Sequence, residues 1–131
     1  MCYQSRRFIG LAALEALVPR LKERYNTIIV FDSGIRGMLQ MRDGDIQERF
    51  GSGAQVHVVA TSAKADETVL AIAETDQAMY ILSNDRFDDF AGRRAVSEKR
   101  IVRHEIVNNA VHIHELELSV KFLTDTPRVN F

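Results

Sequence analysis

The sequence predicts a single α/β domain with a mostly parallel sheet and a C-terminal β-hairpin. The chain has 131 residues, 46% hydrophobic and 27% charged, which is typical of one folded domain. Over the first ninety residues, short apolar runs alternate with helical patterns, and this order favours parallel strands joined by helices. Beyond them, apolar alternations flank Asn108-Asn109, and asparagine tolerates the positive φ of a tight hairpin turn. We therefore treat residues 1–131 as one domain, with an irregular tail from Thr124.

The first half of the chain predicts a helix, a strand and a short helix. Residues 6–24 place leucines at steps of three and four, which is a helical spacing, and Pro19 interrupts that helix or restarts it. The β-branched run TIIVFD at 27–32 predicts a strand buried on both faces. Residues 33–54 predict a loop and a short helix over Ile46 to Phe50.

Two further strands and a helix follow. VHVVA at 56–60 and MYILS at 79–83 predict strands, and ADETVLAIAE at 65–74 predicts a helix with an acidic first turn. Residues 93–103 form a basic segment before the hairpin. The elements therefore alternate as a parallel α/β sheet requires.

Acidic residues gather where the predicted strands end. The carboxyl ends of parallel strands meet at one edge of a sheet, so we expect these side chains to converge. Converging carboxylates repel one another, and their oxygen ligands suit Mg²⁺ or Mn²⁺. A metal held in this way can orient water toward a phosphodiester, so the pattern predicts metal-dependent phosphoryl chemistry. The acids are Asp32, Asp66, Glu67, Asp85, Asp88 and Asp89.

Taken singly, these acids also have structural explanations. Asp66 and Glu67 suit the positive N-terminal end of a helix. Asp85, after Asn84, suits an Asx turn or a helix cap. Because all of these acids fall at one predicted edge of the sheet, a metal-binding site is favoured over these separate structural roles.

Residues 65–90 also carry a recognisable motif. The acidic pair Asp66-Glu67 opens a helix, an apolar strand follows, and then come Ser83-Asn84-Asp85, Phe87 and Asp89. This block resembles the second half of an NYN/PIN-like ribonuclease domain. It most resembles the branch found in the CCCH-zinc-finger ribonucleases, the Regnase family.

The resemblance extends to other segments and covers most of residues 8–118. IIVFD at 28–32 resembles the family's second strand, and residues 95–113 resemble its terminal helix and hairpin. The resemblance implies a three-layer Rossmann-like (PIN/NYN) sandwich. It also implies a metal-dependent endoribonuclease, acting on RNA and more readily on single strands.

By the same resemblance, Asp66, Asp85 and Asp89 would hold Mg²⁺ or Mn²⁺ and the attacking water. Glu67 occupies a position that is usually Asp in this branch, and a longer carboxylate could serve there. Asp88 is adjacent to the matching position.

The sequence departs from the family at its start. The family's domain begins with a strand that ends in an Asp-Gly-Ser-Asn-like turn, whose Asp is a metal ligand, and this sequence has no matching segment. Three interpretations stay open: a piece of a longer nuclease, a degenerate RNA- or protein-binding module, or a sheet that a homodimer or a partner chain completes.

The near-neutral net charge of −1 hides an uneven distribution. Residues 1–31 carry five basic and two acidic groups (+3), residues 32–89 five and eleven (−6), and residues 90–131 seven and five (+2). A basic stretch beside an acidic site suits a nucleic-acid backbone, although a solvated helix face is the alternative. The candidate substrate-binding residues are Asn84, Arg86, Arg93, Arg94 and Arg100, with Arg36 as a further candidate.

Other functions find little support in the sequence. One cysteine, Cys2, excludes an internal disulfide framework and a cysteine-cluster metal site. The apolar runs fall far short of the roughly 18 residues that a membrane-spanning helix needs. We therefore expect a cytoplasmic protein without a membrane partner.

Overall fold

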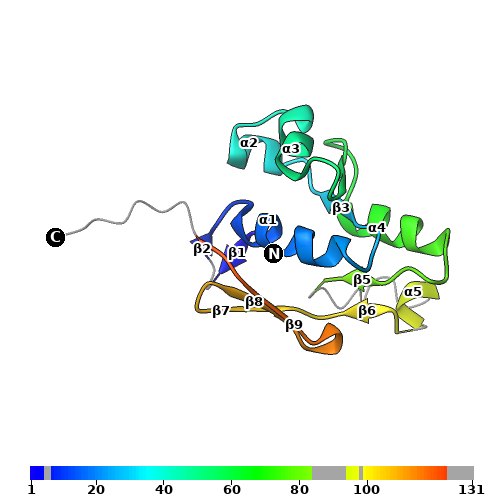
Figure 1. Cartoon of the computed structure of the whole chain (residues 1–131). Coiled ribbons are helices and arrows are strands. Elements are labelled where there is room, and N and C mark those ends of the chain that lie inside the picture. The colour runs from blue at the N-terminus through cyan, green and yellow to red at the C-terminus, as the bar shows by residue number, and fades with distance from the viewer. Residues whose placement is uncertain (5–6, 84–93, 98, 124–131) are drawn as a thin grey trace.

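The computed structural model describes residues 1–4, 7–83, 94–97 and 99–123, and it has a mixed α/β fold (Figure 1). The helices are α1 (Ala12–Lys22), α2 (Ile35–Leu39), α3 (Asp43–Phe50), α4 (Ala65–Glu74), α5 (Arg94–Ser97) and the 3₁₀ helix η2 (His114–Leu116). The strands are β1 (Tyr3–Gln4), β2 (Arg7–Phe8), β3 (Ile28–Phe31), β4 (Gln55–Val58), β5 (Ile81–Leu82), β6 (Ile101–Val102), β7 (Glu105–Val107), β8 (Ala110–Ile113) and β9 (Leu118–Lys121).

The parallel strands form two separate pairs. β3 pairs with β4, with Ile28 opposite Gln55, and β5 pairs with β6, with Ile81 opposite Ile101. The prediction of an α/β chain with parallel strands is confirmed. In the part of the chain that the structure describes, however, these pairs do not join into one continuous sheet. The expected single, mostly parallel central sheet of a three-layer Rossmann-like sandwich is therefore not confirmed.

The predicted hairpin is confirmed. β7 and β8 pair antiparallel, and the two residues between them, Asn108 and Asn109, have φ of 52° and 58°. Two consecutive positive φ values are characteristic of the type I′ turn, whose twist matches that of the strands. β9 then pairs antiparallel with β8 and completes a three-stranded sheet.

The start of the chain differs from the prediction. The helix expected from residue 6 begins at Ala12, because the preceding segment folds back as the small hairpin β1–β2. The amide of Ile9 donates to the carbonyl of Cys2 at 2.7 Å, and the Tyr3 and Phe8 rings pack edge to face. These are tertiary contacts that a helical leucine spacing does not reveal.

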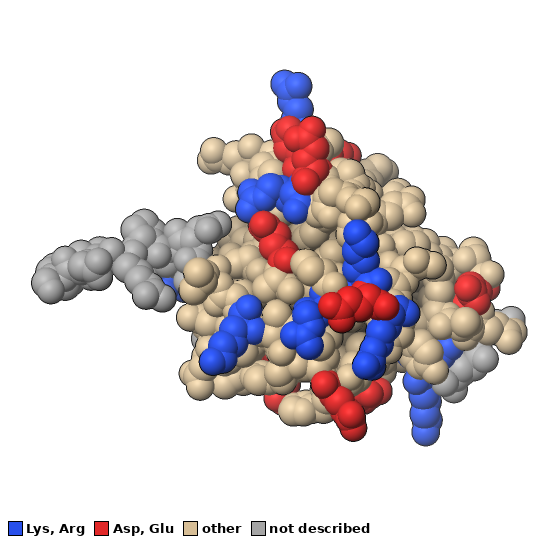
Figure 2. All heavy atoms as spheres, viewed as in Figure 1, with Lys and Arg blue, Asp and Glu red and all other residues tan. Residues whose placement is uncertain are grey.

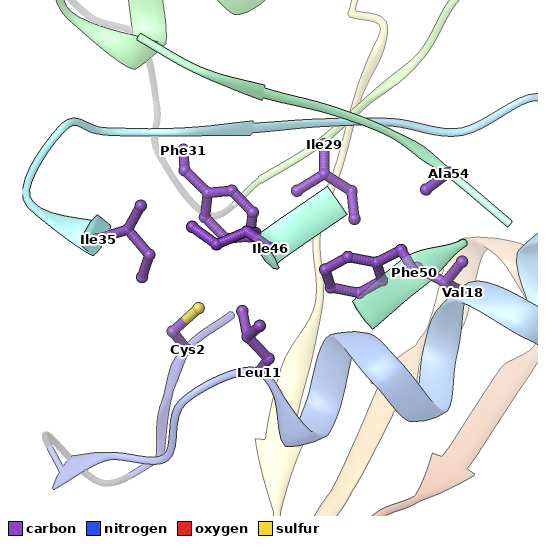
Figure 3. Packing of buried hydrophobic residues seen from close by; sticks show 9 residues of the cluster. All are labelled: Cys2, Leu11, Val18, Ile29, Phe31, Ile35, Ile46, Phe50 and Ala54. Atoms are coloured by element: carbon purple, nitrogen blue, oxygen red, sulfur yellow. The ribbon is translucent and has the colours of Figure 1, made fainter. Parts of the chain in front are cut away.

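One face of α1 packs against the first strand pair (Figure 3). Leu11, the residue before α1, and Val18 of α1 pack with Ile29 and Phe31 of β3 in a cluster that also contains residues of α2 and α3. Burial of large apolar side chains contributes about 1.5–3 kcal/mol each and fixes α1 on this pair. The whole cluster is Cys2, Leu11, Val18, Ile29, Phe31, Ile35, Ile46, Phe50 and Ala54.

The other face of α1 packs against the second half of the fold. Leu17 is fully buried, and with Ala13 and Leu21 it joins a cluster that includes Val102 of β6 and Val111 of β8. The β3–β4 pair and the β5–β6 pair therefore both pack against α1. In Figure 1, β3 lies toward the top of the view and β6 toward the bottom, with α1 between them.

The expectation that β3 is buried on both faces is wrong. Ile29 and Phe31 are buried against α1 and α3, whereas Ile28 is 36% exposed and Val30 is half-buried. The pattern alternates because successive side chains of a strand point to opposite faces, and the packed cluster lies on the face of Ile29 and Phe31.

Two further expectations concern membrane-spanning helices and the C-terminal tail. No helix in the described ranges is long and apolar enough to cross a membrane. The irregular tail expected from Thr124 lies outside the described residues.

Candidate functional site

A cavity of about 1490 Å³ lies between the two parallel strand pairs. Residues of β3 and β5 line it, and α1 and α4 contribute apolar side chains. Asp32, Asp66 and Ser83 line the same cavity where the two strands end. The structure therefore brings together the end of β3, the start of α4 and the end of β5, as the sequence predicts for these elements.

Asp32 fixes the start of α4. Its Oδ1 accepts a hydrogen bond from the amide of Ala65 at 3.0 Å, so the carboxylate satisfies an amide of the helix's first turn. The negative charge also complements the positive end of the helix dipole. This contact gives Asp32 a positioning role, because it sets where the following acidic pair lies.

Asp66 and Glu67 differ in their surroundings. Asp66 is half-buried and lines the cavity, and its Oδ1 accepts the amide of Glu67 at 2.9 Å. Glu67 is exposed and does not line the cavity. Of the acidic pair, Asp66 is therefore the residue placed to meet a ligand in the cavity.

The other expected metal ligands, Asp85 and Asp89, lie outside the described residues, as does Asp88. Within the described ranges, no three histidine, cysteine or acidic side chains gather closely enough to hold a metal ion. The donor chemistry still suits the predicted ion, because the carboxylate of Asp66 is an oxygen donor in the same cavity as Ser83, and Asp85 and Asp89 follow Ser83 in the sequence.

The side chain of Arg100 has a structural role. It is buried, with 6% of the residue exposed, and Nη1 donates to the carbonyls of Ala73, Asp76 and Met79 at 2.9–3.0 Å. A guanidinium held in this way joins the end of α4 to the start of β5. The predicted contact of Arg100 with phosphate does not fit this burial.

The remaining substrate-binding candidates fall on or beside undescribed residues. Asn84, Arg86 and Arg93 lie outside the described residues. Arg94 begins α5, but its side chain is outside the description. Their contact with a substrate stays a prediction.

Arg36 is held at the end of β4. Its Nε and Nη2 donate to the carboxylate of Asp43 at 2.6 and 3.0 Å, and its Nη1 and Nη2 donate to the carbonyls of Val59 and Val58. The hydrogen bond to Arg36 holds the pKa of Asp43 below its ordinary value. These contacts indicate a structural role for Arg36.

Two residues near the cavity, Lys64 and His104, are not among the predicted site residues, and a third, Arg103, is predicted only as a member of the basic stretch. Lys64 precedes α4 and lines the cavity beside Asp66, Arg103 donates to the carbonyl of Ser83 at 3.4 Å, and His104 lines the cavity from the end of β6. The sequence signal was weak: Lys64 is a single charge and Arg103 ends a basic run that contains the buried Arg100.

His104 is a neutral histidine in this fold. Burial, together with a smaller effect of the positively charged N-terminus, lowers the pKa of His104 to about 4. The thiol of Cys2 is also kept uncharged, because burial raises its pKa. Neither group has the ionised form that a cationic contact or a thiolate nucleophile requires.

Charge on the molecular surface is mixed. Figure 2 shows lysine and arginine side chains interspersed with acidic ones on the viewed face. The uneven charge along the sequence therefore does not produce a separate basic patch on this face.

Replacing Arg100 should destabilise the fold. Arg100→Met leaves three carbonyls without their donor, and we expect the free energy of unfolding to fall by about 2–4 kcal/mol. Denaturant unfolding measures the change. Arg20→Met is the matched control, since Arg20 is exposed on α1, and a surface change of this kind stays within about 0.5 kcal/mol. Equal stability of the two variants would contradict the structural role.

His104 should make stability depend on pH. In the unfolded chain a histidine titrates near pH 6.5, whereas His104 in the fold stays neutral down to about pH 4. Between these values the unfolded state binds more protons, so the free energy of unfolding falls as the pH is lowered through this window. The loss should stay below about 2 kcal/mol because His104 is half-buried and partly screened.

Unfolding of wild type and His104→Gln from pH 7 to pH 4 tests this dependence. The variant should lose less stability over the window, whereas His57→Gln, which alters an exposed histidine, should follow wild type. Parallel profiles for all three proteins would show that His104 is not the group responsible.

No family model, curated protein or solved structure gives a significant match to the chain. The likeness of residues 65–90 to NYN/PIN-like ribonucleases therefore rests on the residue pattern alone.

Proposed function

We propose that the chain is a Mg²⁺- or Mn²⁺-dependent endoribonuclease with a PIN/NYN-type, three-layer Rossmann-like arrangement, acting on RNA in the cytoplasm. The observation that carries the proposal is that Asp66 and Ser83 line one cavity at the ends of β3 and β5. Ser83 is directly followed by the segment with Asp85 and Asp89. This arrangement supports convergence of the three carboxylates.

Each element has a part in the proposed chemistry. Asp66, Asp85 and Asp89 would hold the ion, with Glu67 as a further carboxylate. When bound, the ion would supply charge stabilisation at the phosphodiester and a water of lowered pKa. Asp32 positions the helix that carries Asp66, through its bond to the amide of Ala65. Arg86, Arg93 and Arg94 would contact the RNA backbone.

A second candidate is a module on the same fold that binds RNA or protein without cleaving it. The observation that favours it is that Asp32 and Asp66 each accept a hydrogen bond from a backbone amide at the start of α4. In that case the basic residues would bind and the acids would only stabilise helix starts.

Cleavage of a labelled single-stranded RNA tests the enzyme proposal. Wild type should cleave in Mg²⁺ or Mn²⁺ and not after chelation. Asp85→Asn or Asp66→Asn should lower the rate by about 100-fold or more, because each removes a charge that holds the ion. Glu48→Gln, which alters an exposed acid on α3, should leave the rate unchanged. Equal rates for wild type and Asp85→Asn would reject the enzyme proposal, and RNA binding without cleavage would favour the module.

The RNA contacts are tested separately by binding. Replacing Arg93 and Arg94 by Glu should weaken RNA affinity by about tenfold or more at low salt and reduce the dependence of affinity on salt. The control reverses Arg20 and Lys22, exposed residues in the last turn of α1 that do not line the cavity. Unchanged affinity of the Arg93 and Arg94 variant, measured by fluorescence anisotropy, would remove these residues from the interface.

A further inference from the structure

The cavity between the two strand pairs is bordered by strand edges that have no partner among the described residues. The amides of Gln55 and Val59 in and beside β4 donate to the carbonyls of Thr27 and Phe31. In a parallel pair, alternate residues turn their backbone groups to the same neighbour. Ile28 and Val30 therefore turn theirs away from β4 and toward the cavity that they line.

β5 repeats this arrangement from the opposite side. The amides of Ile81 and Ser83 donate to the carbonyls of Arg100 and Val102, on the β6 side. Tyr80 and Leu82 therefore turn their backbone groups away from β6, and both line the cavity. Among the described strands, neither β3 nor β5 has a second neighbour.

β3 and β5 run in the same direction. Asp32, at the end of β3, bonds to Ala65 at the start of α4. Arg100, which precedes β6, bonds to the carbonyls of Ala73 and Met79 at the far end of α4 and just before β5. α4 thus runs back from the carboxyl end of β3 to the amino end of β5, and a strand between them could run parallel to both.

Helices close the cavity on both faces. Ile81 packs with Leu70 and Ala73 of α4, whereas the adjacent Leu82 packs with the cluster around α1. Since successive residues of a strand point to opposite faces, α4 and α1 lie on opposite sides of β5. The side chains that these helices turn into the cavity are Leu14, Leu17, Val18, Leu21, Val69, Ile72 and Ala73.

One unsatisfied hydroxyl and three exposed large side chains lie at this cavity. The hydroxyl of Thr27 is buried and has no hydrogen-bond partner among the described residues. Tyr25, Ile28 and Tyr80 are 46%, 36% and 68% exposed, and all three line the cavity. Exposed apolar groups around a cavity with free backbone edges are typical of a site for another polypeptide segment.

We propose that this cavity binds an extended segment of another polypeptide, which adds a strand between β3 and β5 and runs parallel to both. Four to five residues fit the length of β3, at about 3.3 Å per residue. Both faces of the segment would meet apolar helices, so the segment is rich in valine and isoleucine on both faces. Its amides and carbonyls would pair with those of Ile28, Val30, Tyr80 and Leu82.

A folded second copy does not suit the cavity. The inserted strand must offer both of its edges, and every described strand of this chain is already paired along one edge. The occupant is therefore a segment that is unpaired before it binds. The cavity would take such a strand whether or not the chain cleaves RNA.

Hydrogen exchange with a synthetic peptide tests the proposal directly. The probe is the acetylated and amidated peptide Lys-Lys-Val-Ile-Val-Ile-Val-Lys-Lys, whose lysines keep it soluble. At saturation, the exchange rates of the amides of Ile28, Val30 and Leu82 should fall by at least about tenfold. The amide of the exposed Gly44 on α3 should not change. Unchanged exchange at the three cavity amides would overturn the proposal.

A peptide methylated on alternate backbone nitrogens is the matched control, because it keeps the side chains and loses the donors of one edge. It should bind at least about tenfold more weakly than the probe. Equal binding of both peptides would show apolar adsorption and overturn the proposal. This comparison uses the wild-type protein and does not depend on a variant folding.

Two protein variants locate the binding. Val69→Glu places a carboxylate in the cavity, and Ala71→Glu places the same group on the exposed side of α4. After circular dichroism confirms folding, Val69→Glu should bind the probe about tenfold more weakly or worse and Ala71→Glu as wild type. Equal binding by the two variants would overturn the proposal.

The free protein provides the last test. A wild-type dimer in sedimentation, with the three cavity amides already protected, would mean that a second copy fills the cavity. Protection in a longer form of the chain that is monomeric would mean that its own added segment does so. Either result overturns a partner segment as the occupant. Unprotected amides in the monomer support it.

Discussion

The packing of α1 against both strand pairs is the interaction on which the rest of the structure depends. Val18 faces β3, and Leu17 and Leu21 face the cluster with β6 and β8. With α4 on the other side of β5, this helix sets two parallel pairs around a cavity instead of allowing their edges to meet. Backbone edges are costly to leave without partners away from water. A segment bound in the cavity would pair the edges of β3 and β5, which have no second neighbour among the described strands.

The same arrangement gives the candidate site its geometry. β3 and β5 end at the cavity, and Asp32 ties the start of α4 to the end of β3. Asp66 thereby lines the same cavity as Ser83. The second group of acidic residues, Asp85, Asp88 and Asp89, follows Ser83 in the sequence. A strand added between β3 and β5 would end at the rim of the cavity as well. Binding of a polypeptide segment and assembly of the acidic site would then be coupled through one edge of the fold.

Sequence patterns predicted the elements whose signals are local. α4 occupies the expected residues 65–74, and Asn108-Asn109 forms the expected turn, because amphipathic spacing and turn chemistry depend on neighbouring residues. The β1–β2 hairpin escaped prediction because it depends on the packing of Tyr3 against Phe8. Arg100 was misplaced for a similar reason: its carbonyl partners lie 21–27 residues away, and a basic run looks the same whether its members are exposed or buried.

Binding of a divalent cation at the cavity rim is the central claim, and Mn²⁺ tests it most directly by paramagnetic broadening of backbone amide signals. Sub-stoichiometric Mn²⁺ should broaden the amides of Asp66 and Ser83, and Asp85→Asn should abolish the effect. The amides of Glu48 and Ser52, which do not line the cavity, should stay sharp. Uniform broadening, or selective broadening that persists in Asp85→Asn, would contradict a metal site formed by these carboxylates.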